Sequence, residues 1–478
     1  MQRRTKIVAT LGPASDRKKT LRKMIDAGLD VARLNFSHGD ADEHRRRAQE
    51  LRDAARRCGR DVGLLGDLQG PKIRVLRFRD RSVELEDGDA FFLDSSLGID
   101  DGTKEGVGVA LPTMHEDVSP GDTLLLNDGM INLRVDRIEG TRVHTTVVNG
   151  GILSNHKGIN KKGGGLSAAA LTDIDRENIK LAAELEADFL AVSFVRDGED
   201  VHLARRLFDE AGGHGLIVAK IERVEAVENL DSIIEAADVI MVARGDLGVE
   251  MGYAELTGIQ KKLIRKTRKA SKIVITATQM MESMIRNPIP TRAEVSDVSN
   301  AVMDGTDAVM LSGETAVGRY PVKSIRAMAE VCTGAEKYQL PRGTTRHRMG
   351  DYFDRVDEAI AMAVMYTANH LDVSAIIALT ESGSTARWMS RIRSDIPIYA
   401  LTPHVATSRR VCLYRGVFPV SFELTKKMQK NLYRNVFDAL LPGELVNIGD
   451  FVIFTKGDQE GVSGGTNSMT IIEVTKPE

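Results

Sequence analysis

The sequence predicts an α/β protein: a (β/α)8 TIM barrel that carries an inserted small β-barrel lid domain and is followed by a C-terminal α/β domain. Three observations support this. Apolar strand-like runs alternate with segments of helical spacing, a turn-rich stretch of about 100 residues interrupts that series once, and a second α/β pattern follows a polar stretch near residue 340. With 478 residues, the chain is long enough for about three domains.

The barrel is predicted from residues 1–69 and 169–339. Its strand candidates are continuous apolar runs rich in β-branched residues, a pattern typical of parallel strands that are covered on both faces. The strand candidates are 6–10, 31–36, 63–68, 189–194, 216–222, 238–244, 272–278 and 308–313. Helical spacing is found between them at 17–27, 174–186, 201–211, 224–236 and 259–270. The repeated β-then-α order predicts a closed barrel.

The insert, residues 70–168, has a different pattern. Short alternating stretches at 82–89, 123–135 and 142–151 are separated by Gly and Asp turns, which predicts a small antiparallel β domain. Because the insert leaves the C-terminal end of a barrel strand, we expect it to lie above the barrel mouth and act as a lid.

The C-terminal domain is predicted from residues 340–478. The polar segment 339–352 is a plausible linker. Strand candidates follow at 375–381, 397–403, 417–421, 450–458 and 467–474, and helical stretches at 357–370, 384–393 and 427–440. We expect an α/β sheet with some antiparallel pairing at an edge.

Composition excludes several classes of protein. Lys and Arg number 65 against 68 Asp and Glu, so the formal charge of −3 offers no overall basic field for nucleic acid or an anionic membrane. No stretch approaches the roughly 18 uncharged apolar residues that a membrane helix needs. The 3 cysteines show no CxxC spacing, and the chain starts without a hydrophobic signal segment. We therefore expect a cytoplasmic protein.

Polar residues collect where the predicted barrel strands end, and the active site of such a barrel forms at the C-terminal ends of its strands. Every strand candidate except the first contributes. The residues are Arg33, Asn35, Ser37, His38, Asp67, Ser193, Phe194, Lys220, Glu222, Arg244, Gly245, Asp246, Thr278, Gln279, Ser312 and Glu314. This clustering predicts one active site at the barrel mouth.

Lys220 and Glu222 lie two residues apart on a strand, so their side chains project to the same face. An ammonium beside a carboxylate suits a phosphate or an enolate next to a hard divalent cation, although a buried structural ion pair is an alternative. Asp246 follows Gly245, which allows backbone N–H groups to approach a ligand. Glu222 and Asp246 are oxygen donors that Mg²⁺ prefers, and Mn²⁺ is an acceptable substitute. They are the predicted metal ligands.

The motifs at 31–39, 66–74, 219–223, 241–250, 276–284, 287–321 and 414–420 resemble those of pyruvate kinase, in the family's order. The resemblance spans nearly the whole chain. It implies phosphoryl transfer from phosphoenolpyruvate to ADP, giving pyruvate and ATP. It also implies that Arg33 and Lys220 hold the phosphoryl group while Glu222 and Asp246 bind Mg²⁺. A homotetramer is the assembly that the resemblance favours.

The same resemblance gives roles to residues around this centre. Thr278 and the backbone of Gly245 and Asp246 are implied to face the substrate carboxylate, and Thr278 acting through water is a candidate proton route to the enolate. Arg74, together with Asn35 and His38, is implied to contact the nucleotide.

One segment departs from the pattern of K⁺-dependent members. Those members bind K⁺ through residues that match Asn35, Ser37, Asp67 and the position of Leu68, and they have Glu where this chain has Lys72. The combination here resembles the K⁺-independent branch. We expect the ammonium of Lys72 to replace K⁺, so that K⁺ is not required.

A loop in the C-terminal domain follows a strand and opens a helix, which is a geometry that binds anions. Its candidate phosphate ligands are Thr380, Ser382, Ser384 and Thr385. A purely structural capping role is about equally compatible with these residues, but in the family the matching loop binds the phosphate of an allosteric activator. The Gly-rich segment 461–467 is expected to close the same pocket. Glu381 disfavours a doubly phosphorylated sugar by charge repulsion, so a sugar monophosphate or AMP is the expected effector.

Two other functions use the same features. A Mg²⁺-dependent lyase or aldolase acting on pyruvate enolates would share the barrel, the carboxylate pair and the lysine, but it gives no reason for Arg74 or the lid. A sugar phosphate sensor with a vestigial barrel would not retain Arg33, Lys220 and Thr278. An ADP-to-ATP assay separates these functions.

Overall fold

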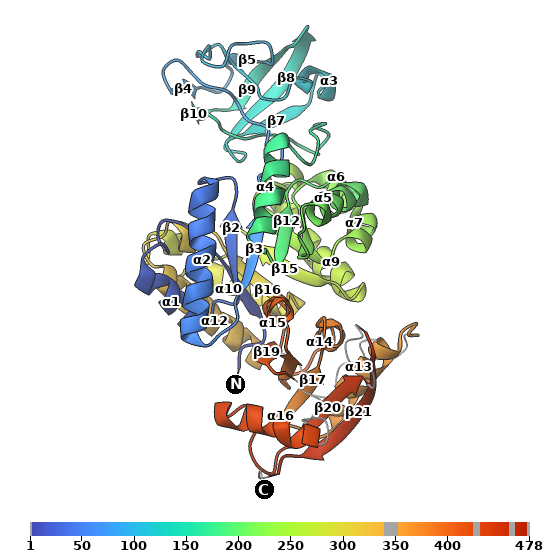
Figure 1. The fold of residues 1–478 in the computed structure, drawn as a ribbon. Coiled ribbons are helices and arrows are strands. Elements are labelled where there is room, and N and C mark those ends of the chain that lie inside the picture. Colours follow the sequence, from blue (N-terminus) through green and yellow to red (C-terminus); the bar gives the residue numbers. More distant parts are fainter. Residues whose placement is uncertain (1, 339–351, 424–430, 458–463, 476–478) are drawn as a thin grey trace.

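The computed structural model describes residues 2–338, 352–423, 431–457 and 464–475. Three parts follow one another along the molecule: the inserted β domain, the barrel and the C-terminal domain (Figure 1). Within the described ranges, no helix is long and apolar enough to cross a membrane. The predicted linker lies outside the described residues, apart from residue 352.

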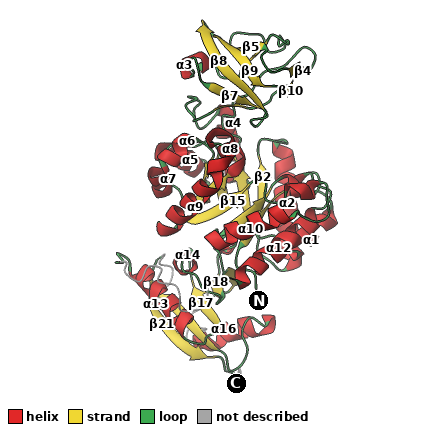
Figure 2. Cartoon of the chain, turned by 180° about the vertical axis from the view of Figure 1, so that it is seen from behind, coloured by secondary structure: helices red, strands yellow, loops and turns green. Residues whose placement is uncertain are grey.

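The barrel is closed by eight parallel strands, as predicted. They are β1 (Lys6–Thr10), β2 (Val31–Asn35), β3 (Gly63–Asp67), β12 (Phe189–Val192), β13 (Leu216–Ile221), β14 (Val239–Ala243), β15 (Ile273–Ala277) and β16 (Ala308–Leu311). The order around the barrel is β1-β16-β15-β14-β13-β12-β3-β2, with β1 closing onto β2. Almost all of their residues are buried on both faces, because side chains fill the interior and helices cover the outside (Figure 2).

Each of the five segments predicted to be helical in the barrel is helical, and the barrel has further helices besides them. The barrel helices are α1 (Lys18–Asp26), α2 (Ala41–Cys58), α4 (Asp173–Glu184), α5 (Gly198–Glu210), α6 (Val224–Glu228), α7 (Leu230–Ala236), α8 (Arg244–Met251), α9 (Tyr253–Lys269), α10 (Arg292–Asp304), α11 (Gly313–Ala316) and α12 (Pro321–Lys337), with a 3-10 turn at Glu282–Ile285. The expected helix over 224–236 is divided at Asn229. Helix α8 was not expected, because Gly245 and Gly248 weaken the helical signal.

The insert has its own core and its own sheets. Its elements are β4 (Ser82–Leu85), β5 (Ala90–Asp94), β6 (Gly106–Gly108), α3 (Met114–Asp117), β7 (Thr123–Leu126), β8 (Ile131–Glu139), β9 (Arg142–Asn149), β10 (Gly151–Ser154) and β11 (Ile159–Lys161). Six strands form a sheet in the order β11-β7-β8-β9-β5-β6, and β10 pairs with β4. The pairing of these strands is antiparallel, as expected, except between β5 and β6, which pair parallel at one edge of the sheet.

The C-terminal domain is a five-stranded sheet in the order β19-β18-β17-β20-β21. Its elements are α13 (Val356–His370), β17 (Ala375–Leu379), α14 (Ser384–Ser390), β18 (Ile398–Thr402), α15 (Val405–Val411), β19 (Val417–Ser421), α16 (Leu432–Leu440), a 3-10 turn at Leu441–Gly443, β20 (Phe451–Gly457) and β21 (Thr466–Glu473). Only β21 pairs antiparallel among these five strands, which confirms the antiparallel edge.

A buried ion pair joins the C-terminal domain to the barrel. Arg391 follows α14, and its guanidinium binds both carboxylate oxygens of Asp307 at 2.5 and 2.8 Å, just before β16. It also donates to the Lys272 carbonyl at 2.7 Å, just before β15. The two charged side chains are 1% and 3% exposed. The end of α14 is thereby held against the ends of the barrel strands that lie opposite the predicted active site.

Candidate active site

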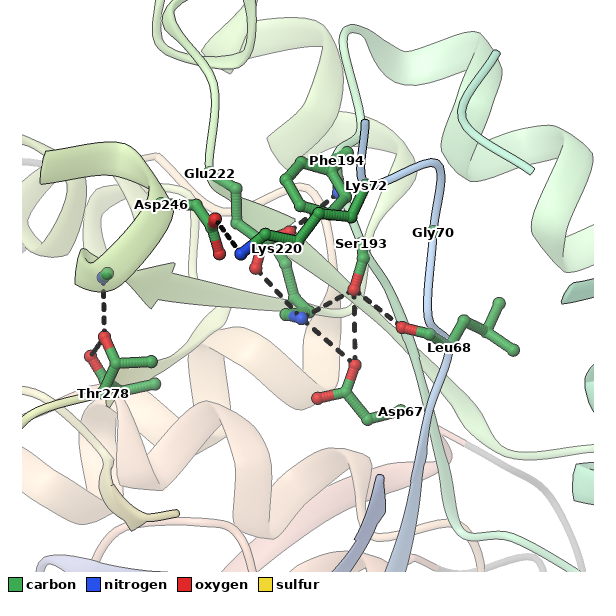
Figure 3. A network of polar contacts seen from close by, with 12 residues as sticks. Asp67, Leu68, Gly70, Lys72, Ser193, Phe194, Lys220, Glu222, Asp246 and Thr278 are labelled. Atoms are coloured by element: carbon green, nitrogen blue, oxygen red, sulfur yellow. Dashed lines mark hydrogen bonds and ion pairs between the residues drawn. The ribbon is translucent and has the colours of Figure 1, made fainter. Parts of the chain in front are cut away.

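The side chains predicted at the strand ends converge around Lys220, on β13 (Figure 3). Its ammonium donates to Ser193 Oγ at 2.6 Å and lies 3.2 Å from Asp67 Oδ1 and 3.0 Å from Glu222 Oε1. These residues come from β13 and the position directly after it, from the segment after β12 and from the end of β3. Closure of the barrel therefore brings an ammonium and two carboxylates together in a nearly buried space.

Arg33 adds a second cation from β2. Its Nε donates to Asp67 Oδ2 at 2.6 Å, and its Nη1 donates to Thr10 Oγ1 at 2.9 Å. Thr10 is the last residue of β1, so the first strand also contributes to the site. The expectation that it does not was wrong, although a polar residue at the end of that apolar run was a signal that could have shown it. Asp67 thus orients both predicted phosphate-binding cations.

The two predicted metal ligands point toward the same space (Figure 3). Glu222 Oε2 accepts a hydrogen bond from the Phe194 amide at 2.9 Å, which orients this carboxylate. Asp246 lies in the first turn of α8 and binds the ammonium of Lys72 through Oδ1 at 2.9 Å. Each carboxylate therefore has one lysine beside it.

These contacts shift the pKa values of the buried groups. Burial opposes ionisation of Asp67, but Lys220 and Arg33 hold its pKa below the ordinary value. Burial also opposes the charge on Lys220, yet Asp67 and Glu222 raise its pKa. The pKa of Glu222 is raised by burial and by the nearby carboxylates of Asp246 and Asp67, against the attraction of Lys220. Burial of the Glu222 carboxylate beside Asp246 and Asp67 is an electrostatic setting in which a divalent cation would favour the ionised form.

Thr278 follows β15 and is joined to the first turn of α8, which directly follows β14. Its Oγ1 accepts a hydrogen bond from the Gly245 amide at 2.8 Å and donates to the Ala277 carbonyl at 2.6 Å. Thr278 and Gln279 have φ angles of 69° and 51°, a left-handed conformation that is unfavourable for side-chain-bearing residues. Arg244 stabilises this turn by donating to the Thr278 carbonyl at 2.8 Å while binding Asp297 at 2.6 Å.

Several other predicted residues contact groups other than Lys220. Asn35 Oδ1 accepts from the Ser37 amide at 3.2 Å, and His38 is exposed. Arg74 donates to the His156 carbonyl of the insert at 2.8 Å, at the base of the lid. The ammonium of Lys72 pairs with Asp246 at 2.9 Å and lies 3.7 Å from Asp128 of the lid. Asp67, a residue of the expected K⁺ site, is instead contacted by the ammonium of Lys220. The contacts of Lys72 and Asp128 were not anticipated from the sequence.

The predicted effector loop is ordered by its own hydroxyl groups. Thr380 Oγ1 accepts from the Gly383 amide at 2.9 Å, and Thr385 Oγ1 bonds Thr466 Oγ1 at 2.6 Å. Glu381 lies 2.6 Å from His404 Nε2. Ser382 and Ser384 are partly buried in the same loop, while residues 461–463 of the expected pocket lie outside the described residues.

The donor set fits a hard divalent cation. In the described part of the chain, no group of three or more His, Cys, Asp or Glu residues is arranged to hold a metal ion. Two carboxylates with the remaining positions filled by substrate oxygens and water is an ordinary arrangement for Mg²⁺. Glu222 and Asp246 provide the two carboxylates.

Comparisons with known proteins agree with this geometry. The family model of the pyruvate kinase barrel domain matches residues 2–325, and that of the pyruvate kinase alpha/beta domain matches residues 358–472. Pyruvate kinase II of Salmonella typhimurium is 54% identical over 477 residues, covering 99% of each chain. Pyruvate kinase of Haemophilus influenzae is 51% identical over 476 residues, covering 98% of this chain and 99% of that protein. Pyruvate kinase of Geobacillus stearothermophilus is 44% identical over 474 residues, or 98% of this chain and 80% of that protein. The chain belongs to the pyruvate kinase family.

Proposed function

We propose that this chain transfers the phosphoryl group of phosphoenolpyruvate to ADP, giving pyruvate and ATP. The observation that carries the proposal is the position of Lys220, whose ammonium contacts Asp67, Glu222 and Ser193 at the barrel mouth. Phosphoryl transfer asks an enzyme mainly for positioning and for neutralisation of charge on the transferring oxygens. A buried ammonium, a nearby guanidinium and two converging carboxylates supply the groups that this chemistry needs.

The residues have separate tasks in this proposal. Arg33 and Lys220 bind the phosphoryl oxygens, and Lys220 then stabilises the enolate that remains. Thr278, with the Gly245 and Asp246 backbone, orients the substrate carboxylate, and Thr278 through water delivers the proton to carbon. A Mg²⁺ ion held by Glu222 and Asp246 would neutralise charge on the transferring oxygens.

Arg74, Asn35 and His38 contact the nucleotide in the same proposal. Arg74 supports this role by its place at the base of the lid, where it already donates to the backbone of the insert at 2.8 Å. The proposed domain boundaries, at 69/70, 168/169 and 339/340, make that base the junction of barrel and lid. A homotetramer remains the proposed assembly.

The test is steady-state kinetics with phosphoenolpyruvate and ADP, in which pyruvate formation and ATP formation are followed separately. Wild type should form both in equal amounts and only with Mg²⁺ or Mn²⁺ present. Lys220→Met should abolish both while the circular dichroism spectrum stays unchanged. Pyruvate formation without ATP would mean that water, and not ADP, takes the phosphoryl group, and it would refute the kinase assignment.

We further propose that K⁺ is not required. The support is the ammonium of Lys72, which lies beside the proposed active site, 2.9 Å from Asp246 Oδ1, whereas the ammonium on Asp67 belongs to Lys220. Wild type should show the same rate in Na⁺ and K⁺ buffers, and Lys72→Glu should acquire a K⁺ requirement. Strong activation of wild type by K⁺ would contradict the proposal.

For the C-terminal domain, we propose that a sugar monophosphate or AMP binds the loop containing Thr380, Ser382, Ser384 and Thr385 and activates the enzyme. The loop follows β17 and opens α14, and Glu381 would oppose a second phosphate. The half-saturating concentration of phosphoenolpyruvate should fall in the presence of such an effector, and Thr385→Val should remove this response. No shift with any sugar monophosphate or with AMP would count against an effector of this class.

A further inference from the structure

The proposed metal site contains two lysines, one for each carboxylate. Lys220 lies 3.0 Å from Glu222, and Lys72 lies 2.9 Å from Asp246 (Figure 3). Two ammonium groups therefore balance the two carboxylates that a divalent cation would use. A cation that binds both carboxylates must displace one of these lysines or accept its repulsion, because two like charges a few ångströms apart repel each other strongly where water is largely excluded.

The two lysines differ in how firmly they are held. Lys220 stands on strand β13, its side chain is 11% exposed, and besides Glu222 it has a second partner in Asp67 at 3.2 Å and a third in Ser193. Lys72 lies in the connection between β3 and β4, and its side chain is 23% exposed. Only Lys72 can therefore move without opening the barrel interior.

Lys72 also has a second acceptor close by. Asp128 of the lid lies 3.7 Å from its ammonium. Its stem lies against the lid backbone, since a Cβ added at Gly158 would approach Lys72 Cε to 2.9 Å. A shift of the ammonium from Asp246 toward Asp128 would keep it paired and would require only rotation at the end of the side chain.

We propose that Lys72 is an internal competitor of the divalent cation: its ammonium binds Asp246 until Mg²⁺ or Mn²⁺ displaces it toward Asp128 of the lid. The inference rests on the proposed function, because it takes Glu222 and Asp246 as the metal ligands. It adds that the affinity for the metal is lowered by a residue of the chain itself. The consequence is weak metal binding before substrate arrives, when no phosphate oxygens help to displace the lysine.

The experiment is a Mn²⁺ titration of the full-length protein without substrates, with free Mn²⁺ measured by electron paramagnetic resonance. Lys72→Met removes the charge and keeps most of the stem, and it should tighten Mn²⁺ binding roughly tenfold or more, because a repulsive charge beside the ion is lost. Lys161→Met is the matched control. That lysine is in the same insert, is 18% exposed and is paired with Asp122 at 2.9 Å, but it has no contact with Asp246 among its described partners.

A second measurement makes the outcome independent of the titration. Saturating Mn²⁺ should raise the thermal unfolding temperature more in Lys72→Met than in wild type, because tighter ligand binding stabilises the folded state further. Equal Mn²⁺ affinity in Lys72→Met and wild type would overturn the inference, as would an equal gain in Lys161→Met.

The Asp246→Asn variant distinguishes failure of the proposed competition from failure of the proposed metal site. If Asp246→Asn weakens Mn²⁺ binding while Lys72→Met leaves it unchanged, the metal site stands and the competition is refuted. If Asp246→Asn has no effect on Mn²⁺ binding, both the metal assignment and the competition fall.

Discussion

Replacing Arg391 by methionine should weaken the attachment of the C-terminal domain to the barrel. The guanidinium is 1% exposed, binds Asp307 through two nitrogens at 2.5 and 2.8 Å and donates to the Lys272 carbonyl at 2.7 Å. Without this guanidinium, the Asp307 carboxylate stays buried. Among its described partners, the Val274 amide still donates to it at 2.9 Å. Removing one partner of a buried ion pair costs about 3–5 kcal/mol, since the other charge is left uncompensated.

The double variant Arg391→Met/Asp307→Asn should lose much less stability than the single variant. Both charges are then removed, and the asparagine side chain still has an oxygen that can accept from the Val274 amide. The difference between single and double variants isolates the cost of the unpaired carboxylate from the cost of altered packing.

Urea unfolding followed by the fluorescence of Trp388 measures this effect. Trp388 is the single tryptophan of the chain and lies on α14, three residues before Arg391. Its fluorescence therefore reports on the C-terminal domain. Circular dichroism follows the whole chain in parallel. Arg45→Met is the control, because Arg45 binds Glu184 at 2.7 Å but both side chains are about half exposed, and little change is expected.

Two results would refute the reasoning. One is a free energy of unfolding for Arg391→Met that falls by less than about 1 kcal/mol, the range of an exposed pair. The other is a double variant that is as unstable as the single variant, because the loss would then come from packing rather than from the unpaired charge.

Three further predictions concern a buried carboxyl group, a helix cap and the turn at Thr278. Burial raises the pKa of Glu250 from 4.5 to about 7, so between these values the folded protein holds a proton that the unfolded chain has lost, and the stability contributed by this group falls as pH rises. Glu250→Gln should therefore make the thermal unfolding temperature depend less on pH between about pH 5 and 8. An unchanged dependence on pH would contradict this. Thr291 caps α10 by accepting from the Glu294 amide at 3.3 Å, and Thr291→Ala should cost about 1 kcal/mol in urea unfolding. Arg244→Met should release the Thr278 turn and lower kcat about tenfold or more with an unchanged circular dichroism spectrum, and full activity would exclude the positioning role.

Local patterns predicted much of the architecture and of the site. The apolar runs gave the positions of the eight barrel strands within one or two residues, because a strand buried on both faces must be apolar throughout. The same runs located Lys220 and Glu222 on one face, where the structure has them 3.0 Å apart. The capping box of Thr291 and Glu294, with the Thr-x-x-Glu spacing at the start of α10, is another such local pattern.

The sequence by itself determined which barrel strands form and, for all but the first, which end of each strand bears the polar groups of the site, since both follow from the spacing of residues that are neighbours in the chain. Only the tertiary structure decided which distant side chains contact one another. Lys72 and Asp246 are 174 residues apart, and Arg391 and Asp307 are 84 apart. Such pairs form because barrel closure, the lid and domain packing bring distant segments together, and periodicity along the chain carries no information about which distant charge a side chain will meet.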